Sequence, residues 1–141
     1  DIHGNYIMGS DQRPSLTVTS DIESDPPVAD TFTLSPSTVD VSSGAATVTF
    51  SIHITDASGI DIEEFLFKPQ LTKSGAGTII ADANWAIVSG DNKDGIYEAT
   101  ATIPTGTIPG SYNASSGFIY DIHGNYIMGS DQRPSLTVIN N

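Results

Sequence analysis

The chain has 141 residues, with 17 acidic against 5 basic side chains and a formal net charge of −12. This negative charge argues against nucleic acid and anionic membranes as partners, because both are themselves negatively charged. Cysteine is absent, so disulfides and thiolate metal sites are excluded.

One sequence repeat organises the chain. Residues 1–18, DIHGNYIMGSDQRPSLTV, recur letter for letter as residues 121–138, which is 120 positions later. This spacing indicates a tandem array with a unit of about 120 residues, large enough for one core. We therefore predict three parts: residues 1–18 as the C-terminal strand segment of a preceding repeat, 19–30 as an acidic linker that contains two prolines, and 31–141 as one repeat.

Alternating apolar and polar residues predict a series of short strands. In chain order these strands are expected at 31–34, 39–41, 46–55, 60–68, 78–88, 97–103, 111–120 and in the segment that ends at 138. The strand at 60–68 changes its apolar phase, so we expect a bulge near Glu63 and Glu64. The residues expected on one face of the strand at 111–120 are Tyr112, Ala114, Phe118 and Tyr120.

This pattern predicts an all-β fold, a seven-stranded immunoglobulin-like β-sandwich with its first strand split in two. The hallmarks of antibody domains are missing, because there is no cysteine pair and Trp85 lies outside the third strand. A fibronectin-III-like or bacterial variant fits better, with Trp85 and Tyr97 expected in the core.

Three stretches carry a resemblance to a known family. They are TFTLSPSTVDVSSGAATVTFSIHITDASGI at 31–60, SGDNKDGIYEATATIPTGTIPGSY at 89–112, and YDIHGNY at 120–126. Their order resembles the bacterial Ig-like tandem repeats of large surface adhesins. The resemblance implies an extender role in the stalk of a secreted protein, often stiffened by Ca²⁺.

Acidic residues are expected at one end of the sandwich. In a seven-stranded sandwich the loops at 56–59, 91–95 and 121–125 share the end at which the linker joins. Oxygen ligands from Asp, Glu and Asn suit Ca²⁺, so we predict Ca²⁺ at the joints between repeats. The candidate ligands are Asp21, Glu23, Asp25, Asp56, Asp61, Asp91, Asn92, Asp94, Asp121 and Asn125.

A second interpretation of the same residues stays open. Asp and Asn are favoured in turns, because they tolerate left-handed backbone and accept hydrogen bonds from their own main chain. The loop at 91–95 also lacks the ligand spacing and flanking helices of an EF-hand. Turn chemistry alone could therefore explain the acidic loops.

Other candidate residues are weaker. His53 is expected to be a solvated strand residue, and His123 a possible neighbour of a metal. Trp85 could stack on a sugar, although periodicity favours its burial. Lys68, Glu98 and Asn113 supply the residue types of an intramolecular isopeptide bond. No nucleophile motif is present, so we do not predict an enzyme.

The function predicted from the sequence is therefore an extracellular, cell-surface extender repeat whose partners are neighbouring identical repeats. The alternative is a carbohydrate- or ligand-binding β-sandwich module. Leu16 and Val18 have the pattern of a core-facing strand but lack their own domain. We expect residues 1–18 to make a strand contact with another molecule.

Overall fold

The computed structural model describes residues 4, 14–18, 24–63 and 68–141, and every regular element in them is a β-strand. The strands are β1 Val28–Ser35, β2 Thr38–Asp40, β3 Ala46–Thr55, β4 Gln70–Lys73, β5 Gly77–Ile80, β6 Ala86–Gly90, β7 Asp94–Ile103, β8 Gly110–Ser115, β9 Ile119–Tyr120, β10 Tyr126–Ile127 and β11 Ser135–Ile139.

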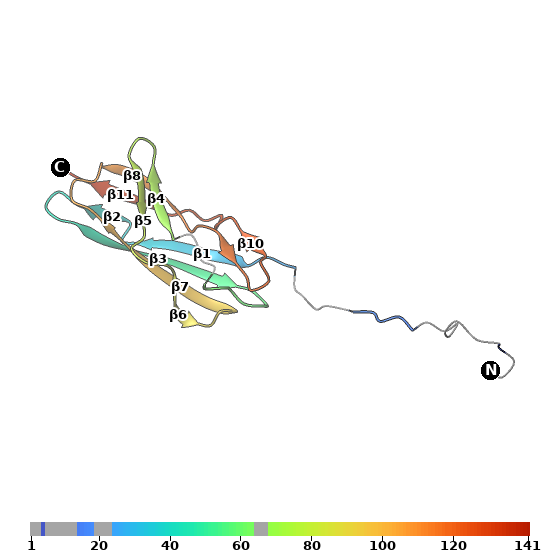
Figure 1. Cartoon of the computed structure of the whole chain (residues 1–141). Coiled ribbons are helices and arrows are strands. Elements are labelled where there is room, and N and C mark those ends of the chain that lie inside the picture. The colour runs from blue at the N-terminus through green and yellow to red at the C-terminus, as the bar shows by residue number, and fades with distance from the viewer. Residues whose placement is uncertain (1–3, 5–13, 19–23, 64–67) are drawn as a thin grey trace.

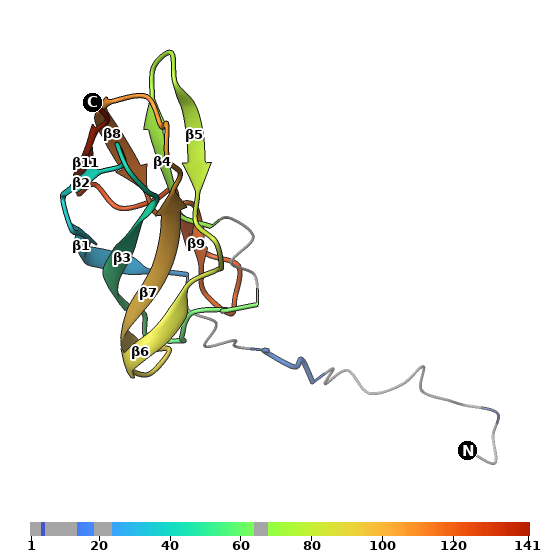
Figure 2. The same ribbon diagram turned by 90° about the vertical axis from the view of Figure 1, so that its left-hand side faces the viewer.

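Two sheets pack face to face as a β-sandwich (Figure 1, Figure 2). One sheet has the order β1-β3-β7-β6, the other has the order β2-β11-β8-β4-β5, and β9 and β10 form a separate hairpin. These orders are those of an immunoglobulin-like sandwich, in which β1 and β2 are the two halves of the first strand. The predicted fold class is confirmed.

The centre of the first sheet is a ladder between β3 and β7. Ten residue pairs run without interruption from Ala46 opposite Ile103 to Thr55 opposite Asp94. The inward side chains of β3, which are fully buried, are Val48, Phe50, Ile52 and Ile54. The strand predicted at 46–55 is confirmed, because a ten-residue alternation leaves only one register that buries every apolar residue.

Three aromatic rings, from β1, β3 and the residue before β6, pack together in the core. Phe32, Phe50 and Trp85 lie with ring centroids 6.1 to 6.3 Å apart. Trp85 is 2% exposed, and its Nε1–H donates to the Ser116 carbonyl at 3.2 Å. The expected burial of Trp85 and Tyr97 is confirmed, since both lie in the core.

A tyrosine fixes the start of β8. The Tyr112 hydroxyl, on a side chain 1% exposed, donates to the Ile108 carbonyl four residues upstream at 2.8 Å. A tyrosine that bonds back to the main chain at this corner is a known feature of immunoglobulin-like sandwiches. The contact gives the buried hydroxyl a partner and holds the preceding loop against the sheet.

The third strand was predicted in the wrong place. Strand β4 is Gln70–Lys73, in the stretch expected to be a loop, whereas Ile60 makes an isolated bridge to Asp121. Leu71 is the one fully buried side chain of this short strand, so its alternation is hardly visible in the sequence. The predicted bulge reaches Glu64, which lies outside the described residues.

The strand predicted at 78–88 is two strands in different sheets. β5 pairs with β4, and β6 pairs with β7. The chain crosses between the sheets at Ala81, whose N–H donates to Pro69, and Asp82, whose N–H donates to Thr100. Ala81 and Trp85 are apolar and are buried at this crossing. Their apolar side chains led to the prediction of one continuous strand.

The face assignment of the strand at 111–120 holds only for its first half. Tyr112 and Ala114 are buried, but β8 ends at Ser115, and Gly117 adopts a positive φ of 77°. The phase then shifts, so that Ile119 is buried while Phe118 and Tyr120 are only partly covered. The glycine interrupts the extended backbone between β8 and β9, which alternation alone does not reveal.

The chain enters and leaves the sandwich at opposite ends (Figure 1). β1 begins at Val28, inside the segment predicted as linker, because Val28 and Ala29 pair with Thr55 and Ile54. β11 runs parallel to β2, which continues the direction of β1. We call the end at which β1 begins the leading end, and the end at which β11 stops the trailing end.

The aromatic core gives the first prediction. Replacing Phe50 by Ala should lower the free energy of unfolding by about 3–5 kcal/mol, because a fully buried ring is removed from between two others. Thr47→Ala, on the exposed face of the same strand, should change it by less than about 0.5 kcal/mol. Urea unfolding measures both, and equal losses would contradict this core.

Candidate functional site at the leading end

Three loops meet at the leading end, as the predicted topology requires. Main-chain hydrogen bonds join Asp56 N–H to the Lys93 carbonyl at 2.9 Å and Ile60 N–H to the Asn92 carbonyl at 2.8 Å. Ile122 N–H donates to the Gly59 carbonyl at 3.0 Å. The loops after β3, β6 and β9 therefore form one surface rather than three separate turns.

A positive φ and a close side chain explain a glycine in this surface. Gly59 has a φ of 109°, and a Cβ atom there would lie 2.5 Å from Nδ2 of Asn92. Another residue at this position would be strained in its backbone and would displace the Asn92 side chain. Asn92 thus acts in the packing of the loops.

Two of the predicted ligands are occupied within their own turns. Oδ1 of Asp91 accepts hydrogen bonds from the N–H groups of Lys93 and Asp94 at 2.9 and 3.0 Å, which lower the pKa of Asp91. Burial raises the pKa of Asp121, but hydrogen bonds from Asn125 and His123 outweigh it and hold that pKa below its usual value. Both carboxylates stabilise turns, as the alternative interpretation expects.

Asp56 differs from these two. Its Oδ1 accepts from Ser58 N–H, Ser58 Oγ and Gly59 N–H at 3.0, 2.6 and 2.7 Å, and the residue is 7% exposed. Within the described residues, its Oδ2 is buried and has no hydrogen-bond partner. A buried polar atom without a partner is costly, so this oxygen is where the loop surface is chemically incomplete.

Asp56 opens onto a hollow beside the linker. The hollow has a volume of about 500 Å³. It is lined by Asp25, Pro26, Val28, Thr55, Asp56, Ala57, Lys93 and Asp94. Three predicted ligands, Asp25, Asp56 and Asp94, therefore border one space in which the linker meets two loops.

The remaining predicted ligands lie elsewhere. Oδ1 of Asp61 accepts from Glu63 N–H at 3.1 Å, and Asn125 bonds to Asp121. Asp21 and Glu23 lie outside the described residues. Among the residues that the structure does describe, no three His, Asp or Glu side chains are placed to hold one metal ion together. Ca²⁺ binding therefore stays a prediction.

His53 lies between two carboxylates. Its Nε2 is 2.7 Å from Oδ1 of Asp94, and its Nδ1 is 2.7 Å from Oδ1 of Asp30. Asp94 first, and then Asp30, raise the pKa of His53 against the opposing effect of burial. The pKa of Asp30 is lowered, chiefly by its bond to His53. Because the carboxylates face opposite ring nitrogens, the three groups cannot surround one cation.

This arrangement of His53 with Asp30 and Asp94, which we call the clamp around His53, was not identified in the sequence analysis. His53 does lie on the outer face of β3, as predicted, but its partners are 23 positions before it and 41 after it. Strand register would have revealed them, since the ladder that sets Thr55 opposite Asp94 brings position 94 to the end of β3. The clamp ties the start of β1 to β3 and β7.

The side chain of Gln132 makes a second set of contacts that the sequence analysis did not predict. Its Oε1 accepts from Phe32 N–H at 3.1 Å, and its Nε2 donates to the Asp30 carbonyl at 2.7 Å. β1 is an edge strand, and these bonds cover the main chain next to its bulge between Ala29 and Thr31. The side chain thus protects an edge that could otherwise pair with another strand.

The structure does not place the residues for two alternatives raised by the sequence, sugar stacking on Trp85 and an intramolecular isopeptide bond. Trp85 is buried between the sheets, so it cannot present a face to a sugar ring. Glu98 lies on the outer face of one sheet and Asn113 on the outer face of the other, so Lys68 cannot reach both. The side-chain Nζ of Lys68 instead donates to the Asp82 carbonyl at 3.2 Å. His123 is exposed, and its N–H donates to Asp121 within the turn.

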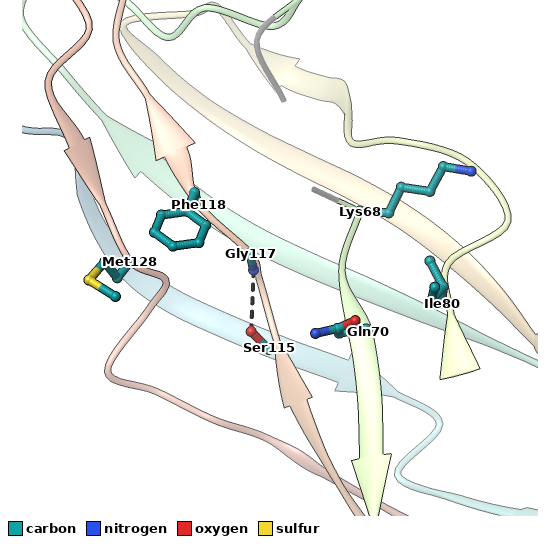
Figure 3. Close-up of a pocket in the computed structure, with 7 residues that line it drawn as sticks. All are labelled: Lys68, Gln70, Ile80, Ser115, Gly117, Phe118 and Met128. Carbon is teal, nitrogen blue, oxygen red and sulfur yellow. Dashed lines mark hydrogen bonds between the residues drawn. The ribbon is translucent and has the colours of Figure 1, made fainter. Parts of the chain in front are cut away.

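A second hollow lies beside β8 and the β9–β10 hairpin (Figure 3). Its volume is about 540 Å³. Its lining residues are Lys68, Gln70, Ile80, Ser115, Gly117, Phe118 and Met128. Phe118 and Met128 lie on one side and Ile80 on the other, so the lining is largely apolar (Figure 3). Among the described residues that line this hollow, none form an acid–base pair or a nucleophile arrangement of the kind used in catalysis.

The fold and the site define a class of protein, an all-β domain of two packed sheets with turn-capping carboxylates at one end. Comparison with protein-family models, curated proteins and solved structures found no match. The resemblance to bacterial surface repeats therefore remains a prediction. The described part of the chain contains no helix with the length and hydropathy needed to cross a membrane.

The clamp around His53 gives the second prediction. A raised pKa in the folded state means that the contribution to stability is fully present below the unfolded value of about 6.5. It is lost as pH rises through the folded pKa. The difference in melting temperature between the wild type and His53→Gln should therefore be largest near pH 5.5 and shrink by pH 8.5.

The matched control is His123→Gln, which alters an exposed side chain in the turn after β9. It is expected to keep the pH profile of the wild type. Thermal unfolding followed by circular dichroism at several pH values makes the comparison. A difference that stays constant with pH for His53→Gln would show that the ring acts by packing alone.

Proposed function

We propose that this chain is a structural extender repeat from a tandem array on a bacterial cell surface. The observation that carries the proposal is the letter-for-letter recurrence of residues 1–18 at 121–138. The opposite placement of the leading and trailing ends supports it (Figure 1). Units joined through such ends follow one another in a line, and each unit adds its length to the array.

The linker should restrict the angle between one unit and the next. Pro27 is buried against the sandwich, and it borders a hollow with Val28, Ile127 and Met128. The segment between the end of one β11 and this anchored proline is therefore short, and proline stiffens it further. A short, partly docked linker favours an extended array over a collapsed one.

The negative charge of each unit also favours an extended array. Residues 19–138 contain 15 acidic and 4 basic side chains, so one unit carries 4 − 15 = −11 charges. Neighbouring units repel one another at low ionic strength. This repulsion keeps the surfaces of adjacent units apart and keeps the array soluble.

Ca²⁺ at the joint is the second part of the proposal. Asp25 belongs to the linker, whereas Asp56 lies in the loop after β3 and Asp94 is the first residue of β7, and all three border one hollow. A bound Ca²⁺ would supply positive charge to the buried Oδ2 of Asp56 and tie the linker to the loops. Ca²⁺ takes six to eight oxygens, so main-chain carbonyls and water would complete the shell.

The extender role gives the third prediction. A protein that carries residues 19–138 twice in succession should have a maximum dimension close to twice that of one unit in small-angle X-ray scattering. Replacing Pro26 and Pro27 by Gly should broaden the distance distribution, because the joint loses its stiff segment. A compact pair whose dimension barely exceeds that of one unit would rule out an extender.

Ca²⁺ binding gives the fourth prediction. Millimolar CaCl₂ should raise the melting temperature by several degrees relative to EDTA, since a ligand of the native state stabilises it by mass action. Mg²⁺ should not reproduce the rise. Asp56→Asn should abolish it, because the amide keeps the turn acceptor but removes the negative charge.

Asp40→Asn is the control for that substitution. Asp40 accepts hydrogen bonds from the N–H and hydroxyl of Ser42, as Asp56 does from Ser58, but it lies at the trailing end. This variant should retain the full Ca²⁺ response. If the wild type shows no response to CaCl₂, the carboxylates of the leading end act in turns only, and the extender role would then rest on the repeat and the linker.

A further inference from the structure

The two sheets have four edge strands, and β5 is the least protected of them. β1 contains a bulge and is covered by Gln132, and β6 has a register shift where it pairs with β7. β2 has only three residues and ends in Asp40. β5 pairs with β4 without a register shift, and positions 74–81, SGAGTIIA, contain neither a charged residue nor a proline. Bulges, charges and prolines are the usual devices that stop an edge strand from pairing, so β5 is open to a further strand.

The open side of β5 lies at the margin of the five-stranded sheet (Figure 2). Thr78 is exposed, and Ile80 is 56% exposed although it is a large apolar residue. β5 belongs to the middle of the chain, so its exposure does not depend on the segment before β1. An exposed edge made of β-branched residues suits another strand.

One hydrogen bond shows which main-chain groups of β5 face the open side. Ala81 N–H donates to the Pro69 carbonyl at 2.9 Å, so the main chain of this residue faces the β4 side. In an antiparallel ladder, successive residues direct their N–H and C=O alternately to one side and the other. The register along β5 is unbroken. Ile79 therefore bonds to β4, whereas the N–H and C=O groups of Thr78 and Ile80 face the open side.

We propose that β5 pairs with β5 of a second copy of this chain, antiparallel, about a two-fold axis at Ile79. This register places Thr78 of each copy opposite Ile80 of the other. Each such pair exchanges two main-chain hydrogen bonds, because both residues face the open side. The pairing joins the two five-stranded sheets into one continuous sheet.

The partner is a second copy because β5 complements itself in this register. On the outer face the exposed Ile80 packs beside the methyl group of Thr78, and on the inner face Ile79 meets Ile79. A two-fold contact of this kind uses the same patch on both molecules and closes at the dimer. Charge points to the same edge, since two chains of net charge −12 repel least where they approach through an uncharged strand.

This inference does not depend on the extender role or on Ca²⁺, because β5 lies within one unit. In the proposed array it would supply a lateral contact. Two arrays with the same unit of about 120 residues present their β5 edges at the same spacing, so a weak contact would be repeated along both. Because the paired strands run in opposite directions, the two arrays would do so too, as arrays extending from two facing surfaces would.

Sedimentation of the full chain tests the association. Analytical ultracentrifugation from micromolar to millimolar concentration should show a monomer–dimer equilibrium. NaCl should strengthen it, since salt screens the repulsion between two chains that each carry a charge of −12. A contact held by ion pairs would weaken instead.

Amide hydrogen exchange locates the contact. In the monomer the amides of Thr78 and Ile80 should exchange quickly, and the amide of Ile79, which bonds to β4, should exchange more slowly. Dimer formation should slow exchange at Thr78 and Ile80 and leave Ile79 unchanged. No other packing of two copies gives this alternation along β5.

Two substitutions at Ile80 break the pairing in different ways. Ile80→Pro removes an N–H that faces the open side, a change that an edge strand tolerates at such a position. Each copy then loses one bond, so dimerisation should weaken about tenfold. Ile80→Asp keeps the N–H and places a charge on the edge, which should weaken dimerisation at least as much. Val88→Asp adds the same charge on β6, at a residue 54% exposed, and should leave dimerisation unchanged.

Three results would overturn the proposal. One is a chain that stays monomeric at millimolar concentration in high salt, and another is a dimer in which exchange at Thr78 and Ile80 does not slow. The third is equal weakening by Ile80→Asp and Val88→Asp, which would mean that net charge rather than this edge controls association. If Ile80→Pro does not fold, Ile80→Asp decides, since it alters an exposed side chain. None of these results bears on the extender role, which the two-unit protein tests.

Discussion

The uninterrupted ladder between β3 and β7 is the constraint on which the rest of this molecule depends. Its length fixes which residues are opposite at the leading end, where Thr55 faces Asp94. That register brings Asp56 N–H to the Lys93 carbonyl, and it places His53 within reach of Asp94. A slip of one residue would turn every inward side chain of β3 outward. The chemistry of the loops is therefore a consequence of a hydrophobic alternation in the middle of the sheet.

The strands that could be predicted are those whose own side chains carry the pattern. β3 and β7 each present several inward residues in succession, so their boundaries at 46 and 103 follow from alternation alone. β4 has one fully buried residue, Leu71, and takes its position from pairing with β5 and β8. The crossing at Ala81 depends on two hydrogen bonds to different sheets, and no local pattern encodes them.

The candidate site shows the same division between local and distant causes. The sequence correctly indicated acidic loops at one end, because topology brings alternate loops together. It could not separate Asp91 and Asp121, whose oxygens accept bonds from their own turns, from Asp56, whose Oδ2 is buried without a hydrogen-bond partner. Residue type alone does not reveal that difference, because all three are aspartates in turns. The clamp of His53 was missed for the same reason, since both of its partners are distant in sequence.

Repetition makes the identity of a strand insufficient to define its place. Leu16 and Leu136 belong to the same sequence, yet one is in water and the other is in the core. Arrays of identical units face exchange of strands between neighbours as a general hazard. In the proposed array, a net charge of −11 on each unit and a linker anchored at Pro27 would both keep neighbouring sheets apart, so the features that extend such an array would also limit exchange of strands between its units.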